Sequence, residues 1–455
     1  MQLELIFNIT PSEDGYTATL DVPAQGASGI ELDSVILQDD TVTIRSAKMQ
    51  MTYTGKITGD SIEGTYKQRG QEYPLKLNKT VKKKPGNTAL PSSEEELKKL
   101  AAKETGGYNY SVEDYFRTPQ TFAFKLSPNG DHIAYMKRRD SGERDLYLMD
   151  TETKKESLLK KQEQDLIRGF SWANDERILY LQDKGGDENY HVYGVDINGA
   201  NDKELTPFEG VRVNIIESLK EDKEHIIIQM NKDNPQQEEP YRLNINSGEI
   251  TKLYTVKEGE PPVAGYDFDR EGNLRAISRI VDGVNTELLY KIDGEFKLVK
   301  LTEFGDEFGI SSFNPGSANP DDAYVISNLE GDKIEIQLYD LKKNKKIKTV
   351  FSNDTYDVSG MALSKKRNYE IDYFSYTGEK TQIIPVSDTY KKIYNRLKQE
   401  FGDKQFFTVG RTDDESKYMI AVTSDKIVGE YYLYDVEADE ISLFYKLLPH
   451  LKEED

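Results

Sequence analysis

The sequence predicts an all-β protein: a seven-bladed β-propeller preceded by a small antiparallel β-barrel-like domain and a short helical linker. Two observations carry this prediction. A pattern of four short strands recurs at a spacing of roughly 45–50 residues, which is close to the length of one propeller blade. In addition, 29 Tyr and 17 Phe among 455 residues give the chain enough aromatic surface to bury in a folded core.

Residues 1–79 read as the small antiparallel β-domain. Short runs of β-forming residues at 3–9, 16–22, 34–38, 41–45, 49–54, 61–68 and 73–77 alternate with turn residues. Pairs such as Asp14-Gly15 and Gly59-Asp60 favour tight turns between antiparallel strands. The simplest arrangement of such a meander is a barrel.

Residues 80–107 read as a linker that contains one short helix. The run Lys82–Lys84 lies beside Pro85-Gly86, as expected of a solvated connection. Ser92 with Glu95, or Ser93 with Glu96, can form a capping box, because the serine oxygen accepts a free amide at the start of a helix. The helix is expected to run to about Lys103.

Residues 108–451 are predicted to form the propeller. The clearest copy of the repeat has strands at 122–126, 133–136, 146–150 and 154–159, and six further copies follow it. One polar residue closes the third strand in most copies: Asp150, Asp196, Asn244, Asp340, Ser387 and Asp435. A four-stranded sheet cannot bury both of its faces alone, so seven such sheets are expected to pack side by side into a ring.

Two details of the ring follow from the order of the strands. The first and seventh copies each contain four strand-like runs of their own, so we expect no exchange of strands between the ends of the propeller. Such a ring would open more easily, and both of its ends would lie on the same side.

Residues 388–401 interrupt the pattern, because Tyr390, Ile393, Tyr394 and Leu397 have helical spacing and Gly402 can end a helix. We expect this helix as an insertion between the sixth and seventh copies.

The composition excludes several classes of function. The formal net charge is −21 and the chain has no cysteine. An acidic surface repels phosphate backbones, so no nucleic-acid partner is expected. Thiolate nucleophiles and cysteine-based metal sites are excluded as well. No apolar run reaches the roughly 20 residues of a membrane span, and neither a metal nor a cofactor is expected.

No catalytic residues can be assigned from the sequence. The four histidines, at 132, 191, 225 and 450, are not at metal-ligand spacing, and the Gly-x-Ser-x-Gly motif of a nucleophile elbow is absent. Paired carboxylates have little specificity in a chain with 81 acidic residues. Glu238 and Glu239 are the weak candidates for substrate binding, because they could hold a peptide amino terminus by charge if they faced the central pore.

Two segments resemble a known family. Residues 110–119 (YSVEDYFRTP) and 124–135 (FKLSPNGDHIAY) look like the start of the propeller in bacterial serine peptidases of the prolyl oligopeptidase family, particularly acylaminoacyl-peptidase and dipeptidyl-aminopeptidase-like members. Residues 407–414 (FTVGRTDD) and 423–435 (TSDKIVGEYYLYD) resemble the last blade of that family, with Val428 where a proline is common. Residues 1–79 resemble a small β-domain that precedes hydrolase domains in some exported bacterial enzymes, without its first strand.

The resemblance implies a function for only part of a peptidase. In this family the catalytic Ser-Asp-His triad belongs to an α/β-hydrolase domain that follows the propeller, so no triad residue can be transferred to this chain. The chain would be the non-catalytic, substrate-gating propeller portion of a serine peptidase that hydrolyses short peptides. Its partners would be short peptides and the C-terminal α/β-hydrolase domain. The family's tendency toward export suggests a periplasmic or secreted location.

Two other functions remain open at this stage. The chain could be a stand-alone propeller that acts as a scaffold for a peptide or protein. An enzyme with an active site in its own pore is a weaker alternative, because such sites usually need clusters of metal-binding or acid–base residues that the sequence does not display.

Overall fold

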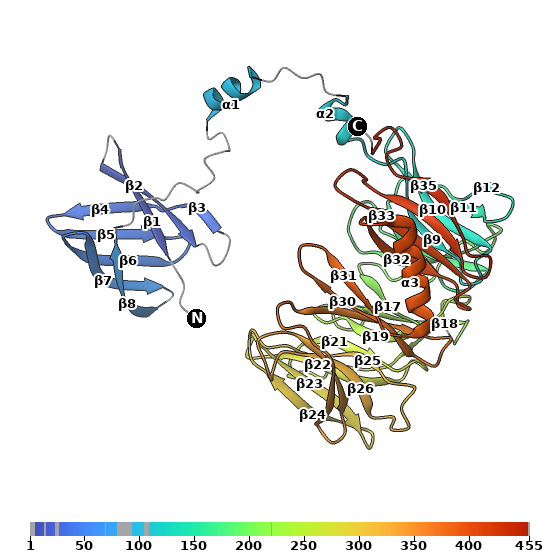
Figure 1. Ribbon diagram of the computed structural model, residues 1–455. Helices are drawn as coiled ribbons and strands as arrows, with labels where there is room; N and C mark the ends of the chain where they lie inside the picture. Colours follow the sequence, from blue (N-terminus) through green and yellow to red (C-terminus); the bar gives the residue numbers. More distant parts are fainter. Residues whose placement is uncertain are drawn as a thin grey trace. The chain divides into compact units, whose positions relative to one another are not determined.

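The computed structural model describes residues 5–12, 15–22, 27–68, 70–79, 93–103, 109–219 and 221–453. The chain divides into two compact units, residues 1–107 and residues 108–455 (Figure 1). Both units are built mainly from β-strands, as the sequence predicts. None of the helices in the described ranges is long and apolar enough to cross a membrane.

The first unit contains one curled antiparallel sheet, drawn in blue in Figure 1. Its strands pair in the order β1-β2-β4-β5-β6-β7-β8, and β3 pairs with the far end of β2. The sheet is an open half-barrel, since its edge strands β1 and β8 are not paired with each other in the described residues. The strands are β1 (Ile6–Ser12), β2 (Gly15–Val22), β3 (Ala27–Glu31), β4 (Ser34–Gln38), β5 (Thr41–Ser46), β6 (Met51–Thr58), β7 (Ser61–Gln68) and β8 (Gln71–Asn78).

Curling lets the two halves of this sheet share one core. Val42, Ile44 and Met51 are buried together with Tyr53. Phe7 on β1 stacks against Tyr53 on β6, with ring centroids 6.0 Å apart, although three strands separate β1 from β6 along the sheet. Alternation of buried and exposed residues along β5 and β6 therefore places one face of the sheet in the core and the other in solvent.

Two short helices lie between the sheet of the first unit and the first blade. Helix α1 (Glu94–Ala101) begins at Ser93, whose side-chain oxygen accepts a hydrogen bond from the Glu96 amide at 3.2 Å. This confirms the serine half of the second predicted capping box. The first, at Ser92, lies outside the described residues, as does the lysine run at 82–84. Helix α2 (Val112–Tyr115) has a capping box made by Ser111 and Asp114.

The second unit is the seven-bladed propeller. Its described residues form seven antiparallel sheets, each built from strands that are consecutive in the sequence (Figure 1). Blade one is β9 (Thr121–Leu126), β10 (His132–Arg138), β11 (Arg144–Asp150) and β12 (Glu156–Lys160); blade two is β13 (Ile167–Trp172), β14 (Arg177–Gln182), β15 (His191–Asp196) and β16 (Lys203–Glu204); blade three is β17 (Val213–Ser218), β18 (His225–Met230), β19 (Glu239–Asn244) and β20 (Ile250–Lys252); blade four is β21 (Val263–Phe268), β22 (Leu274–Val281), β23 (Asn285–Ile292) and β24 (Glu295–Thr302); blade five is β25 (Phe308–Phe313), β26 (Asp322–Ser327), β27 (Glu335–Asp340) and β28 (Lys345–Phe351); blade six is β29 (Val358–Ser364), β30 (Glu370–Thr377) and β31 (Thr381–Pro385); blade seven is β32 (Gln405–Arg411), β33 (Lys417–Thr423), β34 (Glu430–Asp435) and β35 (Glu440–Lys446).

The apolar cores of the propeller lie mostly between adjacent blades. One cluster joins Met136 of blade one to Ile178 of blade two, and another joins Leu179 of blade two to Ile228 of blade three. A strand that is covered on both faces reads as continuously apolar, which explains the run of three isoleucines in β18. Burial between blades is thus the physical cause of the ring.

In blades one, three and seven, the polar residue that ends the third strand starts a tight turn. The Asp150 carboxylate accepts hydrogen bonds from the backbone amides of Glu152 and Thr153. Asn244 and Asp435 accept the equivalent pairs of amides in blades three and seven. The repeat seen in the sequence therefore marks a turn in which a side chain replaces a backbone acceptor.

Blade six departs from the predicted four-stranded pattern, because it has three strands followed by helix α3 (Asp388–Phe401). Ser387, at the phase of the turn residue in other blades, caps this helix by accepting from the Tyr390 amide at 3.0 Å. The bounds predicted for the helix are confirmed. The helix takes the place of the fourth strand, however, and the prediction of a helix added to a complete blade is wrong. Tyr390, Ile393 and Leu397 pack between blades six and seven.

The ring closes without exchange of strands between its ends. Blade seven uses β32–β35 and blade one uses β9–β12, so the predicted absence of strand exchange is confirmed for the described residues. Figure 1 shows these two blades, red and cyan, next to each other. Phe124 of β9 lies 4.9 Å from Tyr431, 5.3 Å from Phe444 and 4.9 Å from Tyr445, measured between ring centroids. This aromatic cluster is the seam of the propeller.

Candidate functional site: the central channel

The turn between the first and second strands of a blade, here called the first turn, lies at one end of the central channel. Lys223 in the first turn of blade three forms an ion pair with Asp413 in the first turn of blade seven, at 3.4 Å between Nζ and Oδ2. These blades are not neighbours, so only the middle of the ring can bring the two side chains together. The pair therefore spans the channel.

A second contact crosses the ring at the same end. Arg270 in the first turn of blade four interacts with Tyr369 in the first turn of blade six, and Glu221 of blade three is close to both. Burial, together with the negative charge of Glu221, raises the pKa of the Tyr369 hydroxyl. Charged and hydrogen-bonding side chains thus narrow this mouth of the channel.

Neighbouring first turns are also tied to one another. The Asp413 amide donates to the Pro128 carbonyl at 2.7 Å, which links blades seven and one. The Asn129 amide donates to Asp175 of blade two at 2.9 Å, and Lys366 donates to the Asp414 carbonyl at 2.6 Å between blades six and seven. These bonds hold the turns in place around the mouth.

The chain enters and leaves the propeller at the opposite end. The first strand of blade one starts there, and the fourth strand of blade seven ends there. The His450 ring nitrogen Nε2 lies 2.9 Å from the Asp114 carbonyl, and the Lys452 amide donates to the Tyr110 hydroxyl at 2.9 Å. The prediction that both ends of the propeller lie on one side is confirmed (Figure 1).

A cavity of about 610 Å³ lies where the two ends meet, and its walls include Arg138, Leu447 and Pro449. Next to these ends, α2 leaves apolar side chains in solvent, since Val112 is 70% exposed and Phe116 is 82% exposed. Exposed apolar groups of this size, clustered beside a cavity, are typical of an interaction surface.

The two carboxylates singled out in the sequence lie at the end of blade three, where the chain turns into β19. Glu238 accepts hydrogen bonds from Arg212 at 2.7 Å, Asn214 at 3.0 Å and Gln229 at 2.7 Å. Glu239 is buried, pairs with Lys252 at 2.5 Å and accepts the Val256 amide at 2.8 Å. A peptide amino group could bind either carboxylate only by displacing these partners, so their role in substrate binding stays a prediction.

The four histidines remain apart from one another. His191 is buried against Glu204, His225 contacts Asp222 at 3.0 Å, and His450 contacts a backbone carbonyl. Among the residues that the structure describes, no group of three or more His, Asp or Glu side chains is arranged to hold a metal ion.

Sequence reasoning missed two charged residues in the innermost strands. Lys125 is the fifth residue of β9 and Asp267 is the fifth residue of β21, the first strands of blades one and four. Burial lowers the pKa of Lys125 and raises the pKa of Asp267 to about 7. The signal in the sequence was a single charge within a run of apolar and aromatic residues, which is costly unless it has a purpose.

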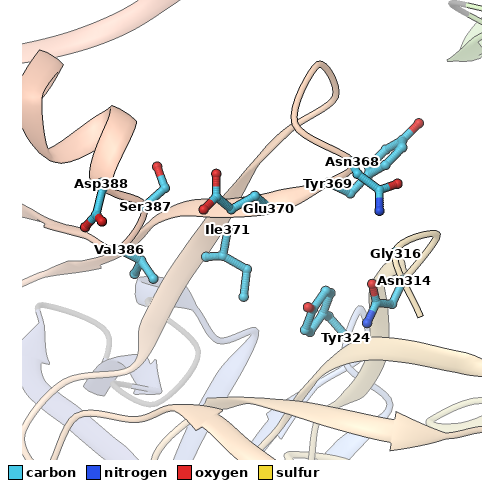
Figure 2. Close-up of a pocket in the computed structure, with 10 residues that line it drawn as sticks. All are labelled: Asn314, Gly316, Tyr324, Asn368, Tyr369, Glu370, Ile371, Val386, Ser387 and Asp388. Atoms are coloured by element: carbon cyan, nitrogen blue, oxygen red, sulfur yellow. The ribbon is translucent and has the colours of Figure 1, made fainter. Parts of the chain in front are cut away.

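A second cavity, of about 570 Å³, opens between blades five and six. Figure 2 shows Asn314, Gly316 and Tyr324 on one wall. The other wall is formed by residues 368–371 of the turn into β30 and by residues 386–388 at the start of α3. The cavity is polar and wide, and it lies beside a blade that has no fourth strand.

A buried charge cluster joins blades six and seven beside this cavity. Arg367 contacts Asp372 and Glu415, and Arg411 contacts the same two carboxylates at 3.1 and 3.4 Å. Ser387 donates to Asp372 at 2.8 Å, which connects the cluster to the start of α3. Arg367 also pairs with Glu370 at 2.8 Å, so the two arginines are compensated by three carboxylates and the cluster holds the two blades together.

Comparison with known proteins gives one sequence relative. No protein-family model matches the chain. Dipeptidyl aminopeptidase BIII of Pseudoxanthomonas mexicana is 22% identical over 352 residues, which cover 74% of this chain and 48% of that protein. The chain is homologous to this part of the peptidase, and it spans about half the length of the curated relative it matches.

Solved structures agree on the fold. A prolyl endopeptidase superposes with a TM-score of 0.50 at 12% identity, covering 72% of this chain and 50% of that one. Prolyl oligopeptidase B from Galerina marginata gives a TM-score of 0.50 at 11% identity, covering 75% and 54%. The resemblance seen in the sequence is thereby confirmed for the propeller portion.

Proposed function

We propose that this propeller is the non-catalytic, substrate-gating part of a serine peptidase that hydrolyses short peptides. The observation that carries the proposal is the ion pair between Lys223 and Asp413 across one mouth of the channel. A mouth crossed by side chains can admit a narrow extended peptide after local rearrangement, whereas a folded protein is too wide. Homology to a dipeptidyl aminopeptidase supports peptides as the substrate class.

The opposite end of the ring would hold the catalytic domain. Both propeller ends emerge there, beside the cavity at Leu447 and the exposed side chains of α2. An α/β-hydrolase domain placed on this side would cover the open mouth and receive peptides from the channel. We propose a periplasmic or secreted location for such a protein, in line with the tendency of the family toward export.

The coding sequence gives the first test. We expect the reading frame that contains this chain to encode a following domain with a Gly-x-Ser-x-Gly motif. If the reading frame encodes no such domain, the proposal fails, and the alternative is a stand-alone propeller that acts as a scaffold for a peptide or protein. The chain alone should release no nitroaniline from dipeptidyl nitroanilides, and turnover that a serine-directed phosphonate blocks would contradict the proposal.

The second test concerns the gate in the full-length peptidase. Removing the cross-channel pair with Lys223→Ala and Asp413→Ala should raise the hydrolysis rate of a 30-residue peptide relative to that of a 6-residue peptide. A matched control removes the exposed pair Lys67 and Glu72 in the first unit, whose Nζ and Oε1 atoms are 2.5 Å apart. An unchanged ratio in the channel variant would refute gating at this mouth.

A further inference from the structure

A cavity of about 260 Å³ lies in the wall of the channel. Its lining includes Ile216 of β17, Asp267 of β21 and Ile310 of β25, which are the first strands of three consecutive blades. Arg270 and Tyr369, from the first turns of blades four and six, complete it. Residues from four blades can meet only at the central channel. The cavity therefore opens into the channel, where a molecule inside the ring would contact it.

Asp267 is the unusual group in this cavity. Its side chain is half-buried, and within the described residues it has neither a hydrogen bond nor an ion pair. Burial is the cause of its raised pKa, and no neighbouring cation offsets that effect. A carboxylate in these surroundings is less stable than one in water, and a bound cation would relieve the cost.

The other charged groups around the cavity are already engaged. Arg270 donates to Glu271 at 2.7 Å, and Asp269 pairs with Arg275 at 3.4 Å. Glu217 and Lys365 each take part in a further interaction. Asp267 is therefore the carboxylate that remains for a ligand among these described residues.

Three aromatic residues also line the cavity, Tyr266 and Phe268 of β21 and Phe313 of β25. Their rings are engaged elsewhere, because Tyr266 and Phe268 pack in an apolar cluster with Val263 and Leu274, and Arg275 lies over the Phe313 ring. Asp267 is therefore the group that would attract an organic cation here. Lys125 occupies the equivalent position on blade one and has no carboxylate partner within the described residues, so its charge would direct a cation toward blade four.

We propose that this cavity binds an organic cation carried by a peptide, with Asp267 as the counter-ion. The cation is either a free amino terminus or the side chain of arginine or lysine. This inference rests on the proposed function in one respect, because it takes the channel to be a route for peptides.

The test uses binding to this chain, measured by titration calorimetry at pH 8. The probe for a side chain is acetyl-Gly-Arg-Gly-amide, and its twin contains citrulline, which has almost the same shape and no charge. The probe for an amino terminus is Gly-Gly-Gly-amide, and its twin is acetylated. We expect one of the charged probes to bind at least tenfold more tightly than its twin, and the arm that does so identifies the cation.

Asp267→Asn should bring the binding of the charged probe down to that of its twin. The matched control is Asp306→Asn, at an exposed position between blades four and five. For the arginine probe, affinity should also fall about tenfold from pH 8 to pH 5.5, because protonation removes the counter-ion. Equal binding of charged and neutral probes, no binding of either charged probe, or full binding by Asp267→Asn would overturn the proposal. Since no hydrolase domain takes part, these results are independent of whether the mouth acts as a gate.

Discussion

The unpaired carboxylate of Asp267 should make the stability of the propeller depend on pH. Its pKa is about 7 in the folded chain and about 3.9 in an unfolded one. The folded state therefore holds the proton more tightly, and the free energy of unfolding falls as the pH rises from about 4 to about 7. Three pKa units correspond to about 4 kcal/mol. Because water still reaches part of the side chain, we expect the free energy of unfolding to fall by about 2–4 kcal/mol over this pH range.

Asp267→Asn removes this titration and keeps the shape of the side chain. The variant should be more stable than the parent chain at pH 8, and the difference between the two should shrink as the pH falls to 4.5. Urea unfolding can be followed through Trp172, the one tryptophan in the sequence, which lies in blade two and donates to the Lys125 carbonyl at 3.0 Å. Its fluorescence therefore reports on the propeller.

Asp306→Asn serves as the control for this measurement, because its carboxylate is exposed and its replacement should change stability equally at both pH values. A constant difference between Asp267→Asn and the parent chain from pH 4.5 to pH 8 would refute the reasoning. So would a variant that is less stable than the parent at pH 8, since that would mean that the carboxylate has a stabilising partner.

Three further substitutions test the contacts between blades. Phe124→Ala should lower the free energy of unfolding by about 3–5 kcal/mol, because it leaves a cavity in the seam between blades seven and one. Urea unfolding measures this loss, and a loss below about 1 kcal/mol would contradict the role of the aromatic cluster in closing the ring. Asp372→Asn should lower the free energy of unfolding by about 3–5 kcal/mol in the same assay, since it removes a buried carboxylate that Arg367 and Arg411 share. A neutral effect would show that the cluster is dispensable. Ser387→Ala should lower the free energy of unfolding by about 1 kcal/mol or more, because α3 loses its N-terminal cap. Hydrogen exchange of the backbone amides in the first turn of α3 should become faster, and unchanged exchange would argue against the cap.

Much of the fold was readable because propeller blades repeat. The polar residue after the third strand recurs for a local reason, since its side chain accepts two backbone amides in blades one, three and seven. The helical spacing of Tyr390, Ile393 and Leu397 gave the bounds of α3 for a similar reason, because these residues pack in a core. Structural features that depend on a few neighbouring residues can therefore be predicted from the sequence.

Structural features that depend on contacts between residues far apart in the chain could not be predicted from the sequence. Strand β3 has one large apolar side chain, Ile30, and a glycine with φ of +68°, so neither alternation nor β-propensity marks it. The loss of the fourth strand in blade six could not be foreseen, because Ser387 occupies the same phase whether a strand or a helix follows. The pair of Lys223 and Asp413 is separated by 190 residues, and only the closed ring brings them together.

The way in which the ring closes bears on where it could open. A propeller without strand exchange has seven similar junctions, which packed side chains and a few hydrogen bonds hold together. The junction of blades seven and one has the Phe124 cluster, and the two chain ends that flank it are joined through Tyr110 and His450. Blades six and seven share the buried charges and α3. Blades five and six share an apolar cluster that includes Tyr324 and Phe374, and they also flank a cavity of about 570 Å³. Absence of strand exchange therefore does not by itself make the junction of blades seven and one the weakest point of the ring.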